Sequence, residues 1–75
     1  MENERIKDVR LYFDLTQSEF GAKLGVTAAA ISRIEVGERA VTKQMRIAIC
    51  REFNVDYEWL VTGQGKMRST DFDAR

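Results

Sequence analysis

The chain has 75 residues, which is enough for one small domain. It carries 12 lysines and arginines and 12 aspartates and glutamates, so the overall charge does not favour a nucleic-acid partner, although a local basic patch can still attract one. A single cysteine, Cys50, excludes an internal disulfide, and the lack of histidine excludes a histidine base and a Cys/His zinc cluster. No apolar run is long enough to span a membrane. We expect a cytoplasmic protein that is not an enzyme and needs no metal or cofactor.

The first two expected helices cover about residues 4–13 and 17–24. The segment TQSE is a capping box, in which the Thr16 hydroxyl accepts a hydrogen bond from the amide of Glu19 and the Glu19 side chain reaches back. Gly25 can adopt a positive φ and end the second helix. The expected inward positions are Ile6, Val9 and Phe13 in the first helix and Phe20 and Leu24 in the second.

The third and fourth expected helices cover about residues 28–36 and 43–53, with Thr27 and Thr42 as N-caps. Arg46 falls beside the apolar stripe of the fourth helix. We expect its aliphatic stem to lie along the edge of the core and its charged head to remain in water. The expected inward positions are Ile31 and Ile34 in the third helix and Met45, Ile49 and Phe53 in the fourth.

The fifth expected helix covers about residues 57–62, with Asp56 as its N-cap and Gly63 at its end. Residues 64–75 show no periodicity, which predicts a flexible C-terminal tail. β-branched residues never alternate for long, so strands are not expected. The sequence therefore predicts an all-α fold with a single domain over residues 1–63.

The spacing of the second and third helices is typical of a helix-turn-helix. Two helices that cross closely need a small residue where they touch, and Gly21 supplies it. The sharp turn between them needs a residue that tolerates a left-handed conformation, and Gly25 supplies that. Apolar residues fall on the facing sides of both helices: Phe20, Leu24, Val26, Ile31 and Ile34.

Four segments carry a family resemblance: RIKDVR, LTQSEFGAKLGVT, ISRIEVGER and FNVDYEWLVTGQGKM. Through them the chain resembles the lambda-repressor-like, Cro/C1-type (XRE) helix-turn-helix family of bacterial and phage regulators, and in particular small prophage-type repressors. The resemblance implies a compact five-helix DNA-binding domain, a transcriptional repressor that reads an operator in the major groove with its third helix, and a homodimer on double-stranded DNA.

The resemblance also implies which residues meet DNA. The corresponding positions are Gln17, Thr27, Ala28, Ala29, Ser32, Arg33, Arg39 and Lys43. Arg33 is the side chain suited to bidentate readout of a guanine, whereas an alanine methyl can only touch a thymine methyl. We therefore expect Arg33 to supply most of the direct readout, and DNA shape and dimer spacing to supply the rest.

Two further sets of residues follow from the resemblance. Arg10 and Glu35 match a structural ion pair that would tie the first helix to the third. Relatives often pair around the junction of the fourth and fifth helices, which makes Val55, Tyr57 and Val61 candidates for a dimer surface.

A protein-binding module, such as an antitoxin or a regulator that acts mainly through a protein partner, is the alternative. The alanines on the third helix and the zero net charge leave room for it. Three apolar residues also fall away from their core stripes, namely Leu11, Tyr12 and Ile47. Binding to DNA that weakens with salt would distinguish the two functions.

Overall fold

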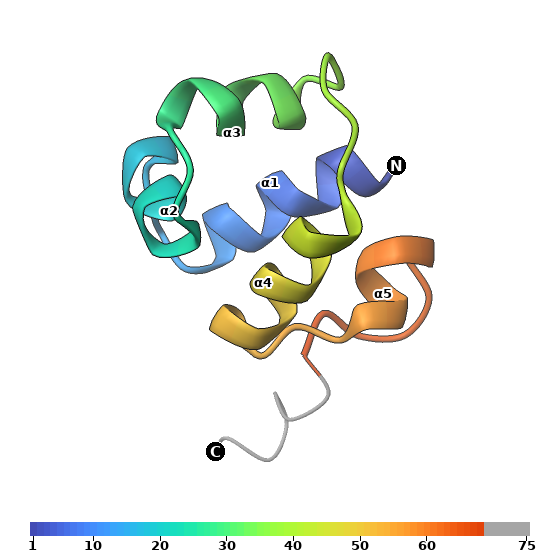
Figure 1. The fold of residues 1–75 in the computed structure, drawn as a ribbon. Helices are drawn as coiled ribbons and strands as arrows, with labels where there is room; N and C mark the ends of the chain where they lie inside the picture. The colour runs from blue at the N-terminus through green and yellow to red at the C-terminus, as the bar shows by residue number, and fades with distance from the viewer. Residues whose placement is uncertain (69–75) are drawn as a thin grey trace.

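The computed structural model describes residues 1–68 and contains five helices in that range. They are α1 (Glu2–Tyr12), α2 (Gln17–Leu24), α3 (Ala28–Glu35), α4 (Lys43–Phe53) and α5 (Tyr57–Thr62). Figure 1 shows α3 along one side of the molecule and α5 on the side away from it, with α1 and α4 between them. The fold is all-α, as the sequence predicts, and no helix in the described range is long and apolar enough to cross a membrane.

Local capping explains where four of these helices begin. The Thr16 hydroxyl accepts from the amide of Glu19 at 3.0 Å, and the Glu19 carboxylate accepts from the amide of Thr16 at 2.9 Å. This is the predicted capping box. The side chains of Thr27, Thr42 and Asp56 likewise accept from the amide three residues on, which satisfies donors that have no partner within the helix.

The helix ends differ slightly from the prediction. α1 begins at Glu2 instead of about residue 4, and α3 ends at Glu35. Val36 follows as the C-cap of α3, and Gly37 then takes a φ of 86° and turns the chain back towards the helix. The added first turn of α1 matters for the interface described below.

Ten buried apolar side chains from all five helices and two connecting segments form one core: Ile6, Val9, Phe20, Ile31, Ile34, Val41, Ile49, Phe53, Val55 and Leu60. At its centre the ring of Phe53 lies 5.1 Å from the ring of Phe20 and 5.1 Å from that of Phe13, measured between centroids. Cys50 packs against this core, and its burial raises the pKa of the thiol, so the group stays protonated and unreactive at neutral pH.

The Arg46 side chain is 26% exposed, so the prediction that its head lies in water holds only in part. Its guanidinium pairs with the carboxylate of Glu2, a residue of the added first turn of α1. The hydrogen bond with Glu2 raises the pKa of the Arg46 guanidinium, and the neighbouring Tyr57 adds to the shift. The pair joins the start of α1 to α4.

The segment after α5 returns to the domain at Met67. Met67 packs against the core, and its carbonyl accepts a hydrogen bond of 2.7 Å from the amide of Asp56. Within the predicted flexible tail, 64–75, Met67 is therefore packed, whereas residues 64–66 are exposed. Residues 69–75 lie outside the described part of the chain.

Candidate nucleic-acid interface

The close approach of α2 and α3 depends on Gly21. A Cβ atom built at this position would lie 2.6 Å from the carbonyl oxygen of Val26 and 3.2 Å from that of Thr27. No side chain fits at such distances, so the absence of a side chain lets the turn pass directly over α2. Gly25 makes the turn itself, with a φ of 78° and open space around it.

This crossing leaves one face of α3 open to solvent. Ile31, Ile34 and Glu35 point into the molecule, whereas Ala29 and Arg33 are exposed on the opposite side. The capping residue Thr27 is exposed as well, and Ala28 and Ser32 are half-buried at the border. Ala30 belongs to the core. Of the three consecutive alanines, two are therefore accessible to a ligand and the third packs inward.

The predicted ion pair between Arg10 and Glu35 is present beneath this face. Arg10 donates from Nε and Nη2 to the two carboxylate oxygens at 2.6 and 3.1 Å, and from Nη1 to the carbonyl of Leu15 at 2.9 Å. The Glu35 side chain is only 3% exposed. Because its charge is removed from water, this carboxylate depends on its donors.

Gln17 supplies another of those donors. Its side-chain amide donates to Glu35 at 3.1 Å, so only one of its two amide protons remains for a phosphate. Gln17 is half-buried and lies at the first position of α2, where backbone amides also lack partners within the helix. The structure thus couples the predicted phosphate-contacting residue to the buried ion pair.

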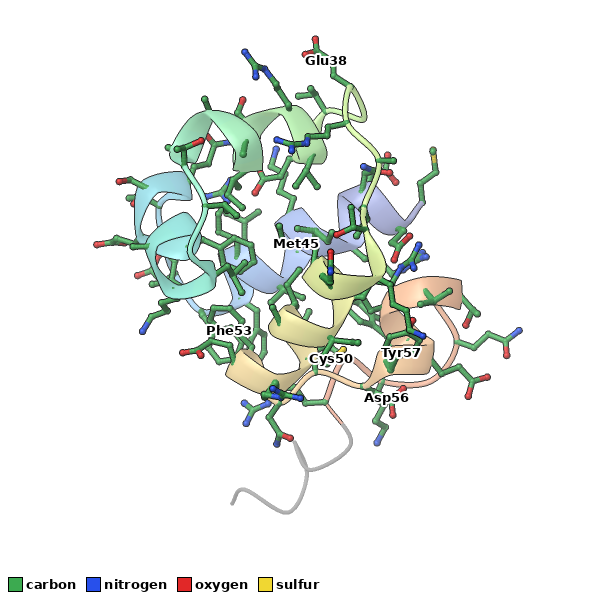
Figure 2. The ribbon with its side chains drawn as sticks, viewed as in Figure 1. Glu38, Met45, Cys50, Phe53, Asp56 and Tyr57 are labelled. Carbon is green, nitrogen blue, oxygen red and sulfur yellow. The ribbon has the colours of Figure 1, made fainter. Side chains whose placement is uncertain are left out.

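The loop after α3 adds two more cationic side chains, Arg39 and Lys43, the second at the start of α4. Both are exposed, and Figure 2 shows the tip of the loop, with Glu38, pointing away from the body of the molecule. Within residues 1–68 the side chains of Arg33, Arg39 and Lys43 make no hydrogen bond or ion pair. They are therefore available to an anionic ligand.

Comparison with known proteins identifies this arrangement. A family model described as "Helix-turn-helix" matches residues 6–60. The structure is also similar to that of the P22 c2 repressor in complex with a synthetic operator, with a TM-score of 0.76 and 25% identity, over 85% of this chain and 97% of that chain.

The chain belongs to the Cro/C1-type helix-turn-helix family.

Two curated relatives of this helix-turn-helix protein match the same length of sequence. Antitoxin PezA of Streptococcus pneumoniae serotype 4 is 39% identical over 67 residues, which are 89% of this chain and 42% of the relative. A propionyl-CoA carboxylase regulator of Cereibacter sphaeroides is 28% identical over 67 residues, 89% of this chain and 14% of the relative. The chain spans less than half the length of either.

The three candidate dimer residues of this helix-turn-helix domain differ in how far they are exposed. Val55 is 6% exposed and belongs to the core, so the prediction that it forms a dimer surface is wrong. Asn54 explains the inward position: it takes a left-handed conformation with a φ of 56° and turns Val55 back under α4 and α5. Tyr57 is exposed at the start of α5, where Figure 2 labels it, and Val61 is half-buried.

Sequence reasoning did not single out the first turn of α1. The Asn3 side chain donates hydrogen bonds to the carbonyls of Ile34 and Arg39. The Arg5 side chain donates to the carbonyls of Leu60 and Val61 and so caps the last turn of α5. A signal was available, because Asn3 lies three residues before the core residue Ile6, and Arg5 four before Val9. Such positions share a helix face.

Proposed function

We propose that this chain is a sequence-specific DNA-binding regulator that inserts α3 into the major groove of an operator and represses transcription. The observation that carries the proposal is the outward face of α3. Its exposed arginine, Arg33, has no partner in residues 1–68, and the cations of the following loop are equally unpaired. The likeness to a repressor solved with its operator supports the same reading.

The residues of this face would make different kinds of contact with DNA. Arg33 is the long donor on the outward face of α3 and would read a base edge, most favourably the two acceptors of a guanine. The short side chains of Ala28 and Ala29 would let the helix backbone lie deep in the groove and touch thymine methyl groups. Arg39, Lys43 and the remaining amide proton of Gln17 would meet phosphates.

The proposal is tested with a duplex selected from a random library by repeated binding to the protein. We expect affinity to fall by about tenfold or more between about 50 and 200 mM salt, because bound cations release counterions from the DNA. Fluorescence anisotropy measures both affinities. Absence of binding to any duplex at low salt would refute the proposal.

Arg33→Ala tests whether Arg33 reads a base. Arg33→Lys is the matched variant, because it keeps the positive charge and loses the planar guanidinium that can donate two hydrogen bonds to one guanine. Both variants should bind the selected duplex more weakly, by about 1–3 kcal/mol, and approach their affinity for random DNA. An equal loss on selected and random DNA would show that Arg33 touches only the backbone.

We further propose that two copies bind neighbouring half-sites and meet through the surface around Tyr57 and Val61. Tyr57 is 43% exposed at the start of α5, where a second subunit could cover it. Tyr57→Glu should abolish cooperative binding to a two-half-site duplex and leave single half-site binding unchanged. Unchanged cooperativity would place the contact elsewhere.

A protein partner is the second candidate function, and one relative named as an antitoxin favours it. The apolar residues Leu11, Tyr12 and Ile47 are exposed on α1 and α4, on elements other than the α3 face. A module that acts only through a protein would show no salt-dependent binding to DNA. The same anisotropy titration therefore separates the two functions.

A further inference from the structure

One side chain from the first turn of α1 bridges the end of α3 and the loop that follows. Asn3 donates from Nδ2 to the carbonyl of Ile34 at 2.7 Å and to the carbonyl of Arg39 at 3.1 Å. A primary amide has two N–H groups, so these two bonds use its full donor capacity. Asn3 thus joins α1 directly to this loop.

The loop itself folds back against the last turn of α3. The carbonyl of Arg33 accepts from the amides of Glu38 and Arg39 at 2.9 and 3.2 Å, and the carbonyl of Ile34 accepts from the amide of Gly37 at 3.1 Å. The backbone of Arg39 is therefore held on both sides, by Arg33 at its amide and by Asn3 at its carbonyl. Its guanidinium, by contrast, is exposed and makes no hydrogen bond or ion pair within residues 1–68.

We propose that Asn3 is a positioning residue of the DNA interface: it fixes the backbone of Arg39 relative to α3, so that the Arg39 guanidinium and the reading helix meet the duplex in one register. The proposal rests on the proposed function. Without the second anchor, the loop would have to be ordered during binding, and the lost conformational freedom would weaken the complex.

The same helix turn offers a matched control. Glu2 is the residue before Asn3 and pairs with Arg46 of α4, away from the loop. Glu2→Gln therefore disturbs the same turn of α1 and leaves the Asn3 hydrogen bonds in place. Asn3→Leu removes both donors at similar side-chain size, and Asn3→Ser serves if the leucine variant does not fold.

The experiment measures DNA affinity over a range of salt concentrations for these variants and for Arg39→Ala. We expect Asn3→Leu to weaken binding about three- to tenfold, the range that follows from ordering one released side chain and its loop on binding. It should also reduce the salt slope in the same direction as Arg39→Ala, whereas Glu2→Gln should change neither. Adding Asn3→Leu to Arg39→Ala should cause little further loss.

A second measurement needs no DNA. Asn3→Leu should accelerate hydrogen exchange at the amides of Glu38 and Arg39, while those of α2 keep their protection.

Several outcomes would overturn the inference. Unchanged affinity and slope in Asn3→Leu, full additivity with Arg39→Ala, an equal effect of Glu2→Gln, or unchanged exchange at Arg39 would each show that Asn3 serves the fold alone. If the unaltered chain binds no duplex, the proposed function fails first; accelerated exchange would then show an anchored loop without a DNA role, which also ends the positioning proposal.

Discussion

Glu35 is a buried carboxylate whose stability depends on a few named donors. Arg10 supplies two of its hydrogen bonds and Gln17 a third, at 2.6, 3.1 and 3.1 Å. The sequence resemblance predicted the partner Arg10, but no pattern showed that Gln17 joins it. That contact arises because the start of α2 and the end of α3 meet in space, which spacing within either helix does not reveal.

Arg10→Met should lower the free energy of unfolding by about 3 kcal/mol or more, because it leaves the Glu35 carboxylate buried with a single donor from Gln17. Urea denaturation monitored by circular dichroism measures the change. The control is Glu4→Gln, which removes a pair between the N-terminal amine and an exposed carboxylate, with side chains 81% and 75% exposed. It should cost at most about 0.5 kcal/mol; similar losses in the two variants would contradict the assignment.

For the helices, the sequence predicts the local contacts at their ends but only some of the contacts between helices. The caps at Thr16, Thr27, Thr42 and Asp56 involve neighbours three residues away, so the sequence contains the whole interaction. The start of α1 was placed late because its first turn is stabilised by distant partners. The inward turn of Val55 was missed for the same kind of reason, since it follows from the backbone conformation of Asn54.

Gly21→Ala and Gly25→Ala separate close packing from backbone conformation. Alanine favours helix interiors over glycine by about 1 kcal/mol, yet at position 21 its Cβ would meet a backbone oxygen at 2.6 Å, so we expect a net loss of about 2 kcal/mol or more. Gly25 has open space and a φ of 78°, so Gly25→Ala should cost about 1 kcal/mol. Thermal denaturation gives both values, and a larger loss at position 25 would refute the crossing argument.

For the whole molecule, a net charge of zero does not show where the charged side chains lie. Three cationic side chains are exposed on α3, on the following loop and at the start of α4, namely Arg33, Arg39 and Lys43, and Glu38 is exposed at the tip of the same loop (Figure 2). Composition did not favour a DNA partner, because a count of charges contains no information about where those charges lie. The sequence pattern predicted the fold almost completely and the exposed face of α3 correctly in outline, whereas contacts between α1 and distant carbonyls required coordinates.

Glu38→Gln should strengthen DNA binding about two- to threefold at low salt, because it removes a negative charge next to the proposed phosphate contacts, and the gain should shrink as salt rises. Glu52→Gln on α4 is the control, since it makes the same chemical change at another exposed site. Anisotropy titrations at two salt concentrations measure both. An equal gain from the two variants would mean that only net charge matters.

The first turn of α1 also bears on how the chain assembles. Glu2, Asn3 and Arg5 bond to groups between 31 and 56 residues further along, whereas α2 and α3 meet through a short turn. Nearby segments meet at a small entropic cost and distant ones at a larger cost. The crossed pair α2 and α3 should therefore form early in folding. The six-residue helix α5 should be the last to dock and the first to detach, because the carbonyls at its end are bonded by the distant side chain of Arg5.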